Sequence, residues 1–382
     1  MPFTPSRWRR RTAALLSTAG LTALTAALAT AAPAAATPYT PWASSQVVAP
    51  GGALSDVAAV ATSATTKEIF WVAENGSVQE DRYYSGIGWF PRQVAPPGSA
   101  DPFADVAAVA RSSGVAGVAP IVDVFWVGPA ESIEHSEEQS NGLMQRWPTV
   151  APAGSATESA SLTGVSRAPN TWEIFYTEST GGIGDAYYYL DGPSGRFELV
   201  PPSSSTPTFE PRQIAAVSRA SNTMEVFYVG HDGSIQDRYY YDGAGWNGFT
   251  LVPAGSAVTY EGAITAVSRA ANTMEVWYIG ADNSVQDRYF FDGAGWRSFT
   301  LAPANSAQSA IAAVAPSANQ MNVTWNAYGE SWLDNANFPP WTVDQITPGG
   351  PVTFGNVAAV SQSSGVDVFQ VTFNGGIEEF SQ

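Results

Sequence analysis

The chain has 382 residues, with 17 lysines and arginines against 34 aspartates and glutamates, which gives a formal net charge of −17. This balance argues against binding to nucleic acid or to an anionic membrane, because both require a basic face. Cysteine is absent and there are 2 histidines, so we expect no disulfide, no metal site and no cofactor.

The first 36 residues have the pattern of a signal peptide. Arg7, Arg9, Arg10 and Arg11 precede an apolar run rich in alanine and leucine, and Ala34-Ala35-Ala36 offers the small residues of a cleavage site. A membrane anchor is the alternative, but alanine and threonine are only weakly apolar. We therefore expect a secreted protein without membrane insertion, in which residues 37–382 form a single domain.

Seven short modules follow, each marked by an Ala-Ala-Val signature or a close variant. The spacing between signatures is near 50 residues, which is typical of repeat architectures. Small residues that recur on the first strand of a module suit a place where strands crowd around a central channel. The signatures begin at Ala58, Ala107, Thr163, Ala215, Thr265, Ala312 and Ala358.

Modules four and five show best what one module folds into. The stretches that begin at Ile214 and Ile264 are identical at 31 of 44 positions. β-Branched and aromatic residues predict four strands in module four, at 214–218, 224–229, 235–241 and 246–252. Asp232-Gly233 and Asp242-Gly243-Ala244-Gly245 supply the tight turns between them. Four antiparallel strands repeated in this way predict an all-β fold, a β-propeller of seven four-stranded blades.

The two ends of the chain predict how the ring closes. Module seven has strands near 366–371 and 376–380 and then stops at Gln382, without a fourth strand. The missing pattern of module four, Trp246 followed by Leu251-Val252-Pro253, occurs as Trp42 followed by Val47-Val48-Ala49. We therefore expect residues 42–50 to pair with the last strand, which removes an exposed sheet edge.

The repeated motifs resemble those of a known family. Ser-Arg-x-x-Asn-Thr-Met-Glu-Val, Asp-Gly-Ser-Ile-Gln-Asp-Arg-Tyr and Asp-Gly-Ala-Gly-Trp are similar to the repeats of the seven-bladed bacterial lectins described from Photorhabdus, which resemble the fungal fucose-binding propeller lectins. The likeness is strongest in modules four and five. It implies multivalent binding of glycans, chiefly fucose and sometimes O-methylated sugars, in shallow pockets between blades, with no metal and no catalysis.

The modules also carry side chains suited to sugars, which need an aromatic face and directional polar groups. Module one offers Glu68, Asp81, Arg82 and Trp89, with Thr62 in place of the arginine; module six has Asn322, and module seven has Gln362 and Asp367. The candidate sugar-binding residues are Arg219, Glu225, Asp237, Arg238 and Trp246 in module four, Arg269, Glu275, Asp287, Arg288 and Trp296 in module five, Arg167 and Glu173 in module three, and Arg111 and Asp123 in module two.

A structural interpretation of the same residues stays open. Arg219 and Glu225 can be a hairpin ion pair, and the tryptophans can be wedges between blades. One observation favours function: modules six and seven keep Ala-Ala-Val but not the arginine and glutamate. The acidic residues around His135 in module two do not belong to the repeated polar set, and we interpret them as a solvated loop insertion.

Two other classes of function compete with sugar binding. A propeller glycosidase would show carboxylates that break the repeat, and we find neither these nor a Ser-His-Asp set nor a sialidase Asp-box in the sequence. A scaffold propeller that binds proteins through one face is compatible with the same residues. The oligomeric state is left undetermined.

Overall fold

The structure is a computed structural model. It describes residues 42–382 except 55, 104, 140–141, 191, 193, 203–212, 261, 329–332, 339–340, 347–351 and 364. The predicted signal peptide at 1–36 lies outside the described residues. Within the part that is described, no helix is long and apolar enough to cross a membrane.

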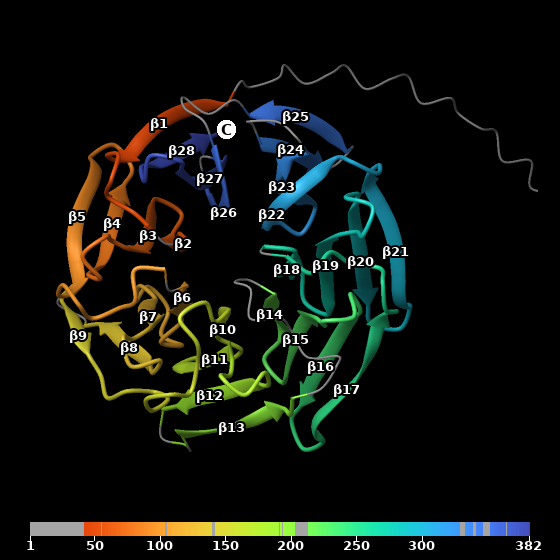
Figure 1. Cartoon of the computed structure of the whole chain (residues 1–382), viewed down its shortest axis with the longest axis horizontal. Helices are drawn as coiled ribbons and strands as arrows, with labels where there is room; N and C mark the ends of the chain where they lie inside the picture. Colours follow the sequence, from red (N-terminus) through yellow and green to blue (C-terminus); the bar gives the residue numbers. More distant parts are fainter. Residues whose placement is uncertain are drawn as a thin grey trace, which may run out of the picture. The chain divides into compact units, whose positions relative to one another are not determined.

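The described chain folds into seven four-stranded antiparallel sheets, which stand side by side as the blades of a ring (Figure 1). The first four blades run from the innermost strand outwards. Blade 1 is β2 (Ala58–Ser63), β3 (Thr66–Val72), β4 (Val78–Tyr84) and β5 (Gly88–Ala95); blade 2 is β6 (Val106–Arg111), β7 (Ile121–Val127), β8 (Ile133–Glu138) and β9 (Met144–Arg146); blade 3 is β10 (Leu162–Val165), β11 (Thr171–Thr177), β12 (Ile183–Tyr189) and β13 (Ser194–Val200); blade 4 is β14 (Ile214–Ala220), β15 (Thr223–Val229), β16 (Ile235–Tyr241) and β17 (Gly245–Val252).

The remaining three blades complete the ring, and the predicted seven-bladed propeller is confirmed. Blade 5 is β18 (Ile264–Val267), β19 (Thr273–Ile279), β20 (Val285–Phe291) and β21 (Gly295–Ala302); blade 6 is β22 (Ala307–Ser317), β23 (Gln320–Ala327), β24 (Leu333–Phe338) and β25 (Thr342–Ile346); blade 7 is β26 (Val352–Gln362), β27 (Gly365–Thr372), β28 (Ile377–Ser381) and β1 (Ala43–Val48).

Blade 7 closes the ring in the way that the sequence predicts. Strand β1 is its outermost strand and pairs antiparallel with β28, with Ala43 opposite Ser381 and Val48 opposite Ile377. Next to this seam, Lys67 of blade 1 reaches Asp367 and Glu379 of blade 7, with 2.8 Å between the Lys67 Nζ and an Asp367 carboxylate oxygen. Strand pairing and buried charge therefore both join the ends of the ring.

The Ala-Ala-Val signatures lie on the innermost strands. The first two residues of each signature and the residue before it, such as Ala58, Ala59 and Val57 in blade 1, line a central channel of about 220 Å³. Thr163 and Gly164 do the same in blade 3, and a Cβ added to Gly164 would come within 2.4 Å of Val109 in the neighbouring blade. Small side chains are therefore required where seven strands converge.

The turns follow the predicted chemistry. Gly233 adopts a φ of 72°, which glycine tolerates without a steric cost. The side chain of Asp232 accepts a hydrogen bond from the backbone N–H of Ser234 at 2.9 Å, as aspartate commonly does in turns. The turn formed by Asp232 and Gly233 holds β15 and β16 in register, with Phe227 opposite Asp237.

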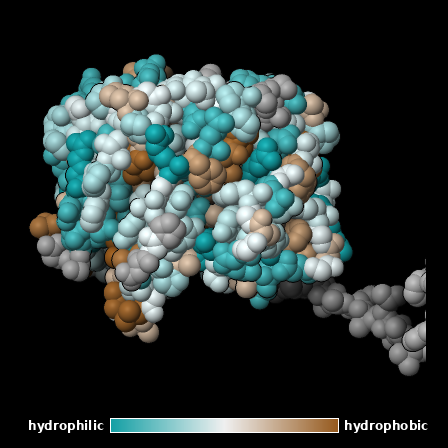
Figure 2. Space-filling model, turned by 90° about the horizontal axis from the view of Figure 1, so that it is seen from below, coloured by the Kyte–Doolittle hydropathy of each residue, from teal (hydrophilic) through white to brown (hydrophobic). Residues whose placement is uncertain are grey.

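Each blade has two faces that meet different neighbours. In blade 4, Phe227 and Val229 belong to the apolar cluster shared with blade 5. Met224, Val226 and Trp246 belong to the cluster shared with blade 3. Because side chains alternate along a strand, every module contributes to two interfaces. On the outer wall near β9, β13 and β17, apolar atoms lie in separate places among polar ones (Figure 2).

Candidate functional site

The five candidate residues of module four do not form one cluster. Asp237 is the cross-strand partner of Phe227, so it faces blade 5 together with Arg219 and Glu225. Trp246 packs against Phe175 of blade 3, with ring centroids 5.9 Å apart. Arg238 alternates with Asp237 along β16 and shares the blade 3 side with Trp246. The same division in module five separates Arg269, Glu275 and Asp287 from Arg288 and Trp296.

A buried polar pair recurs in every blade, on the face that meets the next blade. One member lies on the second strand, and the other lies on the third strand, opposite the residue two positions further along the second strand. Each of these side chains is at most 7 % exposed. From blade 1 to blade 7 the pairs are Glu68 and Glu80, Asp123 and His135, Glu173 and Asp185, Glu225 and Asp237, Glu275 and Asp287, Asn322 and Asn335, and Asp367 and Glu379.

This recurrence corrects two interpretations made from the sequence. In blade 1, Phe70 lies opposite Glu80 as Phe227 lies opposite Asp237, so Glu80 and not Asp81 is the matching residue. Modules six and seven lack the arginine and glutamate, as the sequence shows, but both keep a buried polar pair, so they give no evidence that polar residues at these positions are dispensable to the fold. Their pairs are not accompanied by an arginine of the same module, and in blade 7 the cation is Lys67 of blade 1.

In blades 3 and 4 an arginine links the pair to the following blade. Arg219 donates to Glu225 at 3.1 Å and to Asp292 of blade 5 at 2.9 Å. Arg167 donates to Asp242 of blade 4 at 3.0 Å. The arginine is therefore more than a hairpin ion pair: it joins one blade to the next blade's Asp-Gly turn.

Burial shifts the titration of these carboxyl groups. It raises the pKa of Glu225 to about 7, against the lowering effect of Arg219. Burial also raises the pKa of Asp237 and of Asp287 well above the usual value, and the nearby Glu225 or Glu275 adds to that rise. Among the described residues, Asp237 Oδ1 and Asp287 Oδ1 have no hydrogen-bond partner. These aspartates therefore retain acceptor capacity inside the blade.

The interface between blades 5 and 6 contains a hollow of about 280 Å³. Its polar wall is Arg269, Glu275 and Asp287, and its other walls include Phe299 and Trp341. The Trp341 ring is stacked nearly parallel to Phe299, with 6.3 Å between centroids and 14° between planes. Three of the residues proposed from the sequence thus meet Phe299 of their own module and Trp341 of the neighbouring module. Whether they bind sugar stays a prediction.

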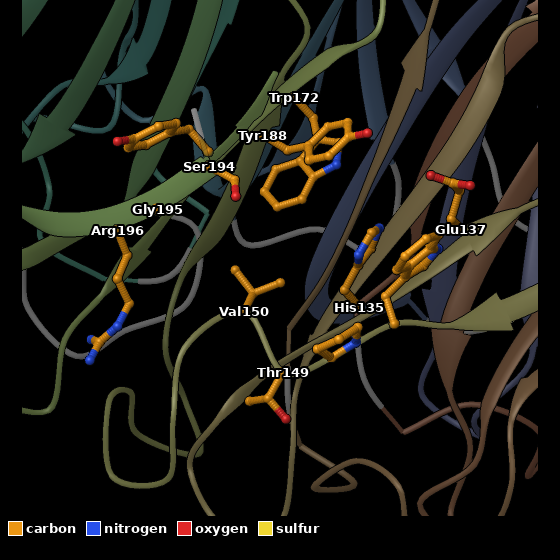
Figure 3. A pocket seen from close by; sticks show the side chains of 12 residues that line it. His135, Glu137, Thr149, Val150, Trp172, Tyr188, Ser194, Gly195 and Arg196 are labelled. Carbon is orange, nitrogen blue, oxygen red and sulfur yellow. The ribbon is translucent and has the colours of Figure 1, made fainter. Parts of the chain in front are cut away.

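A second hollow, of about 330 Å³, lies between blades 2 and 3. In Figure 3, His135 and Glu137 lie on one side, Ser194, Gly195 and Arg196 on the other, and Trp172 and Tyr188 lie together above Val150. Sequence reasoning did not propose these residues as a site. The signal was available: where module four has Trp246-Asn247, module three has Ser194-Gly195.

The surroundings of His135 overturn the interpretation of that segment as a solvated loop. It lies on strand β8 and is 4 % exposed. Its Nε2 is 2.8 Å from Asp123 Oδ1, and its ring stacks on Phe125 with centroids 4.6 Å apart. Arg111 donates to Asp123 and to Glu137. Asp123 and Arg111 thus bond to His135 and Glu137, which line the hollow, but are not themselves lining residues.

The solved structures that are similar to this chain include lectins. The chain is similar to the BP39L lectin of Burkholderia pseudomallei, with a TM-score of 0.75 and 20 % identity over 87 % of this chain and 99 % of that one. AofleA of Arthrobotrys oligospora matches with a TM-score of 0.56 and 14 % identity over 81 % and 91 % of the two chains. The fucose-specific lectin of Aleuria aurantia matches with a TM-score of 0.54 and 17 % identity over 78 % and 96 %.

Because the identities are low, the similarity to these structures shows the propeller fold alone. One of the Aleuria aurantia structures is described as a six-bladed propeller with a novel mode of fucose recognition, whereas the present chain has seven blades. No protein-family model matches the chain, and no curated protein matches it.

Proposed function

We propose that this protein is a secreted, non-catalytic lectin that binds fucose or related O-methylated sugars between its blades, without a metal ion. The observation that carries the proposal is the hollow between blades 5 and 6, where Arg269, Glu275 and Asp287 meet Phe299 and Trp341. A sugar needs this combination, because its C–H surface packs on aromatic rings while its hydroxyl groups bond to charged groups.

The polar wall can donate a hydrogen bond to a sugar hydroxyl group and can also accept one from it. Arg269 forms an ion pair with Glu275, with 2.6 Å between Nε and Oε1, and its guanidinium group carries five N–H groups in a planar fork. Asp287 supplies an acceptor oxygen that has no partner among the described residues. Arrangements of this kind on several blades would give multivalent binding, which raises the overall avidity by roughly 10²–10⁴. The repeated polar pairs support this extension of the proposal.

The test is calorimetric titration of the protein, without residues 1–36, with methyl α-L-fucoside. We expect saturable binding that is unchanged in EDTA. Loss of binding on chelation would contradict the metal-free site. An absence of binding to fucosides and to a panel of methylated glycans would favour the scaffold alternative, and turnover of a fucoside would favour a glycosidase.

A further inference from the structure

At the start of the fourth strand of each blade, one side chain enters the interface with the preceding blade. We call this place the wedge position. In module four this residue is Trp246, opposite Tyr240. Strand register places Trp89, Met144, Ser194 and Trp296 at the same position. Trp341 and Trp42 directly precede β25 and β1 and take this place in blades 6 and 7. Six blades therefore have a large apolar wedge, and blade 3 has a serine.

The wedge tryptophans make the same contact in three interfaces. Each packs edge-on against a phenylalanine of the preceding blade: Trp89 on Phe369, Trp246 on Phe175 and Trp296 on Phe227, with centroids 5.8–5.9 Å apart. The matching phenylalanine of blade 2 is Phe125. An indole ring is therefore the group that this position accommodates elsewhere in the ring.

Blade 3 covers Phe125 in another way. Trp172, which takes the place of Met224 on the second strand, packs on Phe125 at 4.9 Å and stacks on Tyr188 at 5.8 Å. It enters from a strand nearer to the channel than β13, so the space beside Ser194 is left open. This space is the hollow of about 330 Å³ in Figure 3.

We propose that this hollow binds a planar aromatic ring of indole size, which takes the place of the missing wedge. An apolar cavity of about 150 Å³ is enough to hold benzene, so the available volume is ample. Trp147, Trp172, Tyr187 and Tyr188 line the hollow, and aromatic rings favour offset or edge-to-face contacts with such walls. Glu137 lies at the same hollow and can accept a hydrogen bond from a ring N–H.

The test uses free indole and the variant Ser194→Trp, which restores the wedge that other blades have. We expect calorimetry to show one indole per protein, and the variant to weaken binding at least tenfold while its melting temperature does not fall. The matched control is Asn247→Trp, which adds a tryptophan at an exposed position of blade 4 and should bind indole as the native protein does. Equal binding by both variants would overturn the proposal, as would no binding by the folded native protein.

A second measurement does not depend on the variant. A crystal of the native protein soaked with 5-bromoindole should show anomalous bromine density beside Trp172 and Ser194, and bromine found only elsewhere would overturn the proposal. The inference is also independent of sugar binding. Saturating methyl α-L-fucoside should leave indole affinity unchanged, and competition between the two would contradict a separate aromatic site.

Discussion

The interface between blades 4 and 5 differs from the interface between blades 5 and 6, although modules four and five are nearly the same in sequence. Arg219 is 3 % exposed at its side chain, while its counterpart Arg269 is 18 % exposed. Arg219 lies 5.5 Å from the Tyr241 ring and 5.0 Å from that of Phe290, and it pairs with Asp292. Arg269 instead donates to a backbone oxygen, that of Ala318, at 3.3 Å.

The difference comes from the next blade. Blade 5 presents Phe291-Asp292-Gly293-Ala294-Gly295 to Arg219, whereas blade 6 has Phe338-Pro339-Pro340-Trp341 in the corresponding stretch, with no aspartate. A site between blades is made by two modules. High identity between modules four and five therefore does not imply equal sites, and the comparison suggests several ways to test this.

Removal of the aromatic wedges should have the largest effect. Trp296 packs on Phe227 and Phe290, and Trp341 packs on Trp277 and Phe299. We expect Trp296→Ala and Trp341→Ala each to lower the free energy of unfolding by about 3 kcal/mol, as measured by denaturant titration. Only Trp341→Ala should also abolish binding at the blade 5–6 hollow. Equal loss of fucoside binding in both variants would remove the distinction.

The two matched glutamates should differ in binding. If Glu275 accepts a hydrogen bond from a sugar hydroxyl, Glu275→Gln removes a charge-assisted bond and lowers affinity by about 1.5–3 kcal/mol, or roughly ten- to hundredfold. Glu225→Gln should leave affinity unchanged, because Arg219, the partner of Glu225, is 3 % exposed at its side chain, against 18 % for Arg269. Fucoside calorimetry of both variants decides, and a loss of affinity in Glu225→Gln alone would reverse the assignment.

The buried carboxyl groups predict that stability falls as pH rises. Burial raises the pKa of Glu173 and of Glu225 to about 7 in the folded chain, above the usual value near 4.3. The contribution of these two glutamates to the free energy of unfolding is fully present below pH 4 and is lost as the pH rises through about 7. Between the unfolded and the folded pKa value, each group loses about 1.4 kcal/mol per pH unit. Thermal melts from pH 4 to 8 should show this slope, and Glu225→Gln should reduce it. A melting temperature that rises over this range would contradict the prediction.

The smallest change in stability is expected from Asp292→Ala. Its side chain is 47 % exposed, and such an ion pair contributes about 0–1 kcal/mol. The variant frees the outer edge of Arg219, so we expect the number of fucoside molecules bound to rise by one. An unchanged stoichiometry would show that the wedge Trp296, and not the ion pair, excludes sugar from this interface.

The sequence predicted the fold well because the fold is specified within each module. Periodicity, the Asp-Gly turns and the Trp42 pattern were sufficient to place the strands and the closing strand β1. Of the residues in the blade 5–6 hollow, Arg269, Glu275 and Asp287 were proposed from the sequence by their type, and their binding of sugar stays a prediction. Their separation from Arg288 and Trp296 follows from the alternation of side chains across a blade, which a list of motif residues does not express. The buried state of His135 depends on Phe125 and Trp172, the latter from the next blade, and no pattern inside module two contains that information.

The pairing of β1 with β28 has a consequence for the order of folding. Ser45 hydrogen-bonds to Glu379, across 334 positions of sequence, so blade 7 cannot be finished until synthesis has reached its last strand. Contacts of such long range are slow to form because of the loop-closure entropy. During translation, blades 1–6 have all their own strands while β1 has no partner and exposes a sheet edge. A circular permutant that begins in the turn before β2 and joins the present ends would make blade 7 contiguous, and it should close its ring faster than the natural order of strands allows.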